Sequence, residues 1–332
     1  MLYPFLFEPI YKSTIWGGNR LSRYKQLAQP MFGVGESWEV SQVEGNVSVL
    51  TNGPLKGQSL TQLIETYPLE VLGRRVLERF DGQFPLLFKF IDAKRDLSVQ
   101  VHPSDEMARK YHGPKAYGKA EMWYVIEAEP YAALVAGFTR NLSTVEYLFR
   151  MVRDKIEEVL RRFKVQPGDV FFIPPGLVHS IGGGILLLEI QQSSDLTYRM
   201  YDYNRTDSSG KRRELHTRLA AEALDYRYHS HARVAYEDRP DGEATIADCH
   251  YFKSQFLHLS AGSRVCRDKS AAESFVVYNI VQGILHILTP AAENNEKSIA
   301  LHQGQSVLVP ACLTSDIQIV ADTEARLVET CL

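Results

Sequence analysis

Three stretches of the chain place apolar residues at the three- and four-residue spacing of amphipathic helices. The first covers 58–80, where Pro68 and Gly73 are expected to divide it into short segments. The second covers 143–163, and the third covers 212–226. The apolar stripe of the second range consists of Val145, Leu148, Phe149, Val152, Ile156, Val159, Leu160 and Phe163. We therefore predict helices in these three ranges.

The remaining sequence is rich in short runs of Val, Ile, Phe and Tyr bounded by Gly, Pro, Asn or Asp, a pattern typical of strands. Pro85 lies near the start of the first run, where a strand tolerates a missing N–H. The runs before residue 245 are 84–91, 122–126, 132–136, 169–173, 184–191 and 197–203. Many short strands with a few helices predict a β-barrel or a β-sandwich.

The strand pattern restarts near residue 245. The run that begins at Gly304 repeats the spacing of the run that begins at Gly168, which suggests an internal duplication. Beyond Pro310 the second copy has no counterpart of Gly176 or His179, so we expect a packing role for it. The runs of this part are 251–259, 274–281, 283–288 and 304–310.

Composition places the chain among globular proteins, since 45% of its 332 residues are hydrophobic and 23% are charged. We predict a domain covering 1–244 and a degenerate β domain covering 245–332.

The net charge of -3 provides no basic field for nucleic acid, which favours a small-molecule partner. No uncharged apolar run has the roughly 18 residues of a membrane span. Four cysteines without C-x-x-C spacing, and no basic leader, predict reduced thiols in the cytoplasm.

Candidate chemistry centres on the segment from Gly168 to His179, which reads as a strand, a tight turn and an imidazole. This segment resembles the second motif of the cupins. The first cupin motif offers two histidines one residue apart and then a carboxylate. Here Gln100 and His102 share one strand face, and Glu121 follows at more than the usual spacing. We therefore expect an inserted loop over 103–119.

Two imidazoles and a carboxylate form a donor set that suits one zinc ion per chain. Gln100 is a candidate for an additional, weak oxygen ligand, and a position remains open for water or substrate, which implies catalysis. The same donor set also suits a non-haem Fe(II) cupin oxygenase. A sugar-binding cupin without turnover is a third reading, so the donor set alone leaves the function class open.

A closer resemblance, over roughly residues 3 to 230, is to the type I mannose-6-phosphate isomerases, in their short bacterial form. Four blocks carry it, and they follow one another in the order found in that family. They are Ile15–Gly18 with Gly35–Ser41, Leu97–Pro103, Gly118–Tyr124, and Gly168–Gly182 continuing to Glu189–Asp195 and Tyr198–Arg205. The tail after residue 245 carries much less of the resemblance.

The resemblance implies a mainly β cupin, that is, a double-stranded β-helix or jelly-roll barrel with a few helices. It also implies zinc-dependent aldose–ketose isomerisation between mannose 6-phosphate and fructose 6-phosphate through a cis-enediolate. The partner would then be a phosphorylated hexose. The implied metal ligands are His102, Glu121 and His179, with Gln100 as an additional one.

Isomerisation requires a group that carries a proton between two neighbouring carbons. Lys119 and Glu189 are both candidates, and the sequence does not choose between them. The resemblance places Arg199 in the active site, where a guanidinium can stabilise enediolate charge or bind phosphate. Arg205, with the nearby Lys211 and Arg212, is a further candidate for phosphate. The predicted substrate-binding residues are Ser98, Gln100, Trp16 and Arg205.

Overall fold

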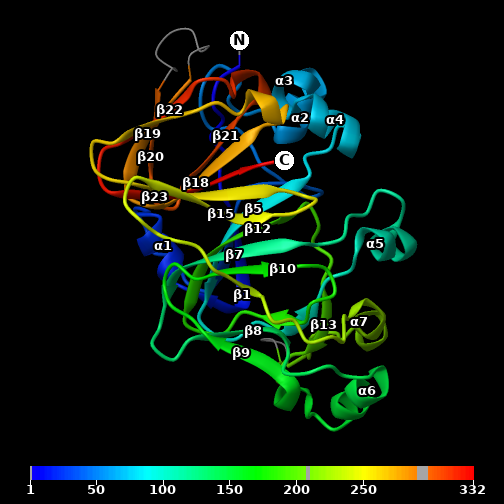
Figure 1. Cartoon of the computed structure of the whole chain (residues 1–332). Helices are drawn as coiled ribbons and strands as arrows, with labels where there is room; N and C mark the ends of the chain where they lie inside the picture. The colour runs from blue at the N-terminus through cyan, green and yellow to red at the C-terminus, as the bar shows by residue number, and fades with distance from the viewer. Residues whose placement is uncertain (1, 207–209, 290–297) are drawn as a thin grey trace.

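The structure is a computed structural model that describes residues 2–206, 210–289 and 298–332. Two antiparallel sheets form its first half, in green and blue in Figure 1. The larger consists of β1 (Ile10–Gly18), β2 (Val34–Val40), β5 (Leu86–Ala93), β12 (Ile185–Gln192), β7 (Glu121–Ala128), β10 (Val170–Ile173) and β14 (Arg233–Val234). The smaller consists of β13 (Tyr198–Tyr201), β6 (Val99–Val101), β11 (His179–Ser180), β8 (Ala133–Phe138) and β9 (Leu160–Lys164).

An apolar core joins these two sheets. Ile91, Val125 and Leu187 of the larger sheet belong to the same buried cluster as Leu134 and Ala136 of the smaller one. Each strand alternates its side chains between its two faces, so the inward faces of both sheets fill a common interior. The mainly β cupin barrel predicted from the sequence is confirmed, and its interior is where the candidate ligands lie.

A second pair of sheets follows in the chain, drawn from yellow to red in Figure 1, and a separate apolar cluster fills it. Its five-stranded sheet consists of β15 (Gly242–Asp248), β16 (Lys253–Leu259), β23 (Ala325–Cys331), β18 (Val276–Gln282) and β21 (Ser306–Val309). Its four-stranded sheet consists of β17 (Arg264–Arg267), β22 (Ile317–Ala321), β19 (Ile284–Leu288) and β20 (Ser298–His302). After β21 a 3₁₀ turn covers Ala311–Leu313, and Ser315 occupies the position that corresponds to His179, as expected for a degenerate cupin.

The start of the chain and three short helices pack against this second unit (Figure 1). Phe5 forms a β-bridge with Leu308. The helices are α2 (Leu60–Thr66), α3 (Pro68–Leu72) and α4 (Arg74–Phe80), with the predicted breaks at Pro68 and Gly73. Gly73 has a φ of 83°, and a Cβ there would lie 2.2 Å from the carbonyl oxygen of Glu273. The division at 244/245 stays a prediction, and it falls within β15.

The helix predicted over 143–163 was wrong in its second half. Helix α6 covers only Thr144–Val152, a 3₁₀ turn follows at Ile156–Val159, and β9 continues the chain. Asp154 adopts a left-handed φ of 54°, which ends the helix. Beyond it the edge of β8 offers unpaired backbone groups, and pairing with that edge overrides the helical periodicity.

The predicted loop over 103–119 contains a helix, α5 (Asp105–His112). Ser104 caps this helix by accepting a hydrogen bond from the N–H of Met107. The third predicted helix is confirmed as the shorter α7 (Thr217–Ala223). The sequence analysis did not identify β1, β2, the short hairpin β3 (Gln42–Val43) with β4 (Asn46–Val47), or the single turn α1 (Arg20–Tyr24). In the second unit it also missed β17, β20, β22 and β23.

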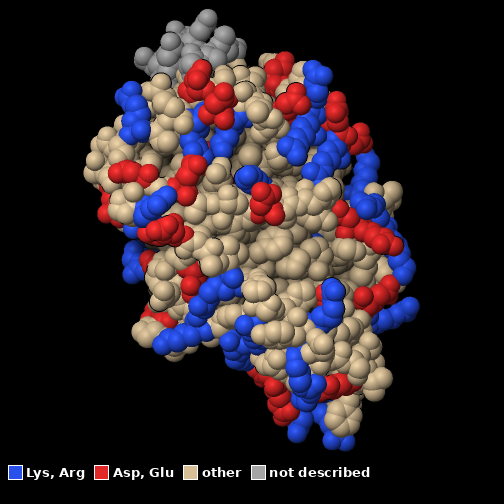
Figure 2. All heavy atoms as spheres, in the orientation of Figure 1, with Lys and Arg blue, Asp and Glu red and all other residues tan. Residues whose placement is uncertain are grey.

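In the described part of the chain, every helix is too short or too polar to cross a bilayer. All four cysteines are free thiols. On the face drawn in Figure 2, acidic and basic side chains are interspersed around uncharged surface.

Candidate metal centre and active site

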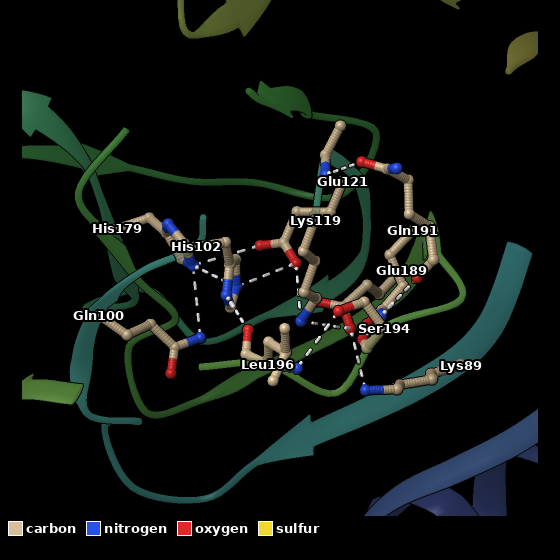
Figure 3. A network of polar contacts seen from close by, with 12 residues as sticks. Lys89, Gln100, His102, Lys119, Glu121, His179, Glu189, Gln191, Ser194 and Leu196 are labelled. Carbon is tan, nitrogen blue, oxygen red and sulfur yellow. Dashed lines mark hydrogen bonds and ion pairs between the residues drawn. The ribbon is translucent and has the colours of Figure 1, made fainter. Parts of the chain in front are cut away.

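The three predicted ligands converge between the two sheets of the first barrel, although they lie far apart in the chain (Figure 3). Glu121 begins β7 on the larger sheet. His102 directly follows β6 on the smaller sheet, and His179 begins β11, where it pairs with Gln100. Among the described residues, these three side chains form the group that could hold a metal ion.

The distances between the donor atoms match those expected around one small ion. The two histidine Nε2 atoms lie 3.1 Å apart. His179 Nε2 lies 3.3 Å from Glu121 Oε1, and His102 Nε2 lies 3.5 Å from Glu121 Oε2. Tetrahedral zinc ligands at about 2.0–2.2 Å from the ion are roughly 3.3 Å from one another. Neither oxygen of the buried Glu121 carboxylate has a hydrogen-bond partner, and only Oε2 has a cation close by, Lys119 Nζ at 3.0 Å, so lone pairs remain for an ion.

Both imidazoles are oriented for metal binding by their other nitrogen. The Nδ1 of His102 is 2.8 Å from the carbonyl oxygen of Leu196, and that of His179 is 2.8 Å from the carbonyl oxygen of Leu177. Because a carbonyl only accepts, each Nδ1 carries the proton and each Nε2 presents its lone pair to the centre. The two backbone carbonyl groups thus fix the tautomer and the ring orientation of both histidines.

Burial keeps these donors in the protonation states that a metal needs. Burial and the nearby Lys119 cation lower the pKa of His102 to about 3, against the opposing effect of Glu121. Burial likewise lowers the pKa of His179. Burial would raise the pKa of Glu121, but Lys119 and the two histidines hold that pKa well below its usual value. Neutral imidazoles and an ionised carboxylate are therefore present at neutral pH.

Gln100 lies next to the group, as predicted. Its Nε2 is 3.3 Å from His179 Nε2, and its Oε1 accepts a hydrogen bond of 3.4 Å from Ser98 Oγ. In this orientation the amide donates to the imidazole. Rotation about the Cγ–Cδ bond would exchange Oε1 and Nε2 and turn the oxygen toward the centre, so a ligand role for Gln100 stays a prediction.

A cavity of about 300 Å³ opens beside the metal group, large enough for a small phosphorylated sugar. Gln100 and five other predicted site residues line it, whereas the three ligands His102, Glu121 and His179, and Arg205, do not. The five others are Trp16, Ser98, Lys119, Glu189 and Arg199. The sequence analysis missed five more lining residues with polar side chains, which are Glu36, Lys89, Asp195, Thr197 and Arg213.

Lys119 and Glu189, the two candidate proton carriers, differ in their surroundings. Lys119 Nζ lies 3.0 Å from Glu121 Oε2 and 3.9 Å from Glu189 Oε1. Glu189 accepts a hydrogen bond of 2.9 Å from the indole N–H of Trp123. Burial, assisted by the charge of Glu121, raises the pKa of Glu189 against the pull of Lys119 and Lys89.

Lys89 is a buried cation that bridges two carboxylates of the cavity, and Figure 3 shows it beside one of them, Glu189. Its Nζ lies 3.4 Å from Glu189 and 3.5 Å from Glu36, and it stands 4.7 Å from the ring centre of Trp38. Burial would lower its pKa, but these two carboxylates raise it. A lysine inside the apolar run of β5 was the sequence signal for this role, because an unpaired buried cation is very costly.

The predicted arginines divide into one at the cavity and one beside it. Arg199 lines the cavity, its Nη1 donates to the carbonyl oxygen of Glu214, and its buried Nε has no hydrogen-bond partner. Burial and the adjacent Arg213 and Arg205 cations lower its pKa. Arg205 and Arg213 both pair with Asp202, and of these two only Arg213 lines the cavity. The phosphate role of Arg205 stays a prediction.

Trp16 lies in the apolar core with 5% of its surface exposed, yet it contributes to the cavity wall. The predicted sugar contact therefore remains compatible with its position. Ser98 is also buried, and its hydroxyl points along the same wall as Gln100. Both substrate-binding assignments stay predictions.

Comparison with known proteins assigns the family. The family model "Phosphomannose isomerase type I, catalytic domain" matches residues 5–133. The chain is 37% identical to mannose-6-phosphate isomerase ManA of Bacillus subtilis over 284 residues, which cover 84% of this chain and 86% of that protein. It is 32% identical to mannose-6-phosphate isomerase of Streptococcus mutans over 97% of this chain and 98% of that protein.

A solved structure agrees with these sequence matches. The crystal structure of the mannose 6-phosphate isomerase from Bacillus subtilis superposes with a TM-score of 0.83 at 30% identity and covers 99% of both chains. The structure of a mannosephosphate isomerase homologue from Archaeoglobus fulgidus has a TM-score of 0.77 at 22% identity, over 99% of this chain and 98% of that chain, and supports the fold alone. The chain described here belongs to the type I mannose-6-phosphate isomerase family.

Proposed function

We propose that the protein interconverts mannose 6-phosphate and fructose 6-phosphate, with one zinc ion held by His102, Glu121 and His179. The observation that carries this proposal is the convergence of three buried metal donors next to a polar cavity, whose lining residues Gln100 and Lys119 lie 3.3 Å from His179 and 3.0 Å from Glu121. The names of the relatives at 32–41% identity supply the substrate. Gln100 is proposed as an additional ligand through its amide oxygen.

Zinc held by these ligands would act as a Lewis acid toward the two substrate oxygens that share charge in a cis-enediolate. The protein's own contribution begins with the ligands. Their neutral imidazoles and ionised carboxylate need no deprotonation before binding. The carbonyl groups of Leu196 and Leu177 fix the orientation of both rings.

We assign the proton transfer to Glu189. A carboxyl with a raised pKa takes and returns a proton near neutral pH more readily than an exposed one. Trp123 and Lys89 hold this carboxyl at the cavity wall. Lys119 forms an ion pair with Glu121, so its ammonium group has no lone pair that could accept a proton. Lys119 then acts as a fixed positive charge beside the carboxylates.

The end of the cavity at Arg199 and Arg213 is proposed to bind the phosphate. Arg199 has no carboxylate partner among the described residues, and its buried Nε lacks an acceptor. A phosphate would supply an anionic partner for the guanidinium and an acceptor for Nε, and a guanidinium can bind two phosphate oxygens at once. Ser98 and Thr197 line the same cavity and can donate hydroxyl groups to the sugar or to the phosphate.

Replacing Arg199 with lysine tests this assignment. Lysine keeps the charge but cannot make two parallel hydrogen bonds, so we expect kcat/KM for mannose 6-phosphate to fall about 100-fold. The thermal midpoint should change little, because the Arg199 side chain makes no ion pair in the described structure. Steady-state kinetics and a melting curve measure both quantities. An unchanged kcat/KM would remove Arg199 from the site.

A coupled isomerase assay on mannose 6-phosphate, run together with metal analysis of the same sample, tests the proposed function. We expect turnover that disappears on chelation and returns with zinc, without oxygen uptake. Oxygen consumption with Fe(II) would instead indicate a cupin oxygenase. Sugar-phosphate binding without exchange of the C2 hydrogen for solvent would indicate a sugar-binding cupin.

We also propose that the enzyme acts in the cytoplasm on a phosphorylated hexose and binds no nucleic acid. The four free cysteines support a reducing compartment. The alternation of acidic and basic side chains on the face in Figure 2 supports the absence of a basic nucleic-acid surface there.

A further inference from the structure

We propose that Asp105 and Gln192 are positioning residues that hold together the two ends of the insertion between His102 and Glu121. These ends, 103–105 and 118–120, form the neck of the insertion. This neck clasp fixes where Lys119 and Glu121 stand relative to Glu189 on β12. The inference rests on the proposed isomerase activity, because it assigns these two residues a role in the rate of that reaction. Neither residue lines the cavity of the site.

The two ends of the insertion meet in unusually close contact. The N–H of Gly118 donates to Asp105 Oδ1 at 2.8 Å, and the N–H of Lys119 donates to the carbonyl oxygen of Pro103 at 3.1 Å. A Cβ on Gly118 would lie 2.6 Å from the backbone nitrogen of Asp105 and 2.7 Å from the carbonyl oxygen of Pro103. Only glycine therefore allows the two ends to approach this closely.

Gln192 joins this neck to the strand that carries Glu189. Its side chain is buried; Nε2 donates to Asp105 Oδ1 at 3.0 Å, and Oε1 accepts from the N–H of Ala120 at 2.9 Å. Its backbone N–H also donates to the carbonyl oxygen of Ala120. One buried amide thus connects the first turn of α5, the residue before Glu121 and the end of β12.

The contacts of the clasp converge on groups of the candidate active site. Lys119, between Gly118 and Ala120, reaches Glu121 at 3.0 Å and Glu189 at 3.9 Å. The neighbouring Tyr117 carbonyl accepts from Ser194 Oγ, which ties the insertion to the segment that carries Leu196. The carbonyl of Leu196 in turn accepts from His102 Nδ1 (Figure 3). A shift of the neck would therefore displace a cation, a metal ligand and the partner of a second ligand.

The charge of Asp105 is not required for this role, whereas its acceptor oxygen is. Gly118 and Gln192 both donate to the same oxygen, Oδ1. An asparagine can present the same carbonyl oxygen to both donors, whereas alanine leaves the buried Gln192 amide without its acceptor. The pair Asp105→Asn and Asp105→Ala therefore separates the hydrogen bonds from the charge.

The experiment compares Asp105→Ala, Asp105→Asn and Gln192→Ala in the zinc-loaded full-length protein. We expect Asp105→Ala and Gln192→Ala to lower kcat about 10- to 100-fold and to change KM less than threefold. The reason is that displacing a catalytic group by about 1 Å can lower the rate by that factor. Asp105→Asn should restore most of the rate. Amide hydrogen exchange over residues 116–121 should accelerate in both alanine variants and stay slow in Asp105→Asn.

Asn52→Ala is the matched control, because Asn52 also joins two backbone segments through its amide, by bonds with Pro4 and Leu6. It should lower the thermal midpoint without lowering kcat. Equal kcat in all variants of an active wild type would overturn the clasp proposal. A kcat loss in Asn52→Ala matching that in Asp105→Ala would also overturn it, in favour of general destabilisation. An inactive wild type with bound zinc would instead count against the proposed function, while the exchange data would still report on the clasp.

Discussion

Replacing His179 with alanine is expected to lower mannose 6-phosphate turnover by at least about 10³-fold, which corresponds to about 4 kcal/mol of activation free energy. His179 Nε2 lies 3.1 Å from His102 Nε2 and 3.3 Å from Glu121, so its loss removes one of three protein donors. Zinc content measured on the same preparation should fall in parallel. Zinc removal from the wild type by a chelator should have the same effect, and added zinc should restore the rate.

The protein should remain folded without His179 or the metal. The backbone of His179 still pairs with Gln100 and Ala136, and the apolar cluster between the sheets contains none of the metal ligands. We expect a loss of about 1–3 kcal/mol in the free energy of unfolding. Full activity in thoroughly metal-free protein would refute the proposed zinc mechanism.

His258→Ala is a suitable control for this experiment. His258 is also buried and also lies between carboxylates, at 2.5 Å from Asp238 and 3.1 Å from Glu324, but it belongs to the second unit. Its removal should lower stability and leave zinc content and turnover unchanged. A similar loss of turnover in both variants would show that destabilisation, and not the metal, explains the effect of His179→Ala.

The metal group was predictable because its chemistry is concentrated in local patterns. The run from Gly168 to His179 contains a strand, a turn that requires a left-handed glycine and the ligand itself, and Gly176 indeed has a φ of 86°. Gln100 and His102 share a strand face at a spacing of two residues. Sequence spacing therefore fixes the direction of these side chains before any long-range contact forms.

The limits of local patterns are clear at residues 143–163. Apolar residues there follow a helical period, but β9 forms because the edge of β8 needs a partner. The predicted stripe is also largely exposed on α6, where Val145 and Val152 retain 77% and 87% of their surface. Pairing with β8 determined the secondary structure of the second half of this segment, and hydrophobic periodicity carries no information about such long-range pairing.

The missed cavity residues show the same limit for polar groups. Lys89 lies in a strand whose eight residues are all buried, so its charge requires a partner of opposite sign, but the sequence analysis did not single it out. Its partners Glu36 and Glu189 come from β2 and β12, on either side of β5 in the sheet. Only the strand order shows which carboxylates the lysine meets. Arg213 likewise reaches the cavity from a loop beyond the short strand of Arg199.

Replacing Glu189 with glutamine is expected to lower kcat by about 10³-fold, within the range of a lost general base, while KM changes little. Glutamine keeps the size of the side chain and can still accept the hydrogen bond from Trp123. It cannot take up a proton. Exchange of the C2 hydrogen of mannose 6-phosphate with solvent, followed by NMR in D₂O, should fall as much as turnover.

The pH dependence of kcat/KM distinguishes Glu189 from Lys119 as the proton carrier. The pKa of Glu189 is raised, so its basic form is lost at a higher pH than for an exposed glutamate, and kcat/KM should fall as the pH drops through that raised pKa. The Lys119 charge lowers the pKa of Glu189, so Lys119→Met should move this fall in kcat/KM, the acidic limb of the pH profile, to higher pH. Activity should be retained above that pH. Glu189→Gln should abolish the limb. If Lys119→Met instead loses all C2 exchange at every pH while Glu189→Gln retains it, the proton carrier is Lys119.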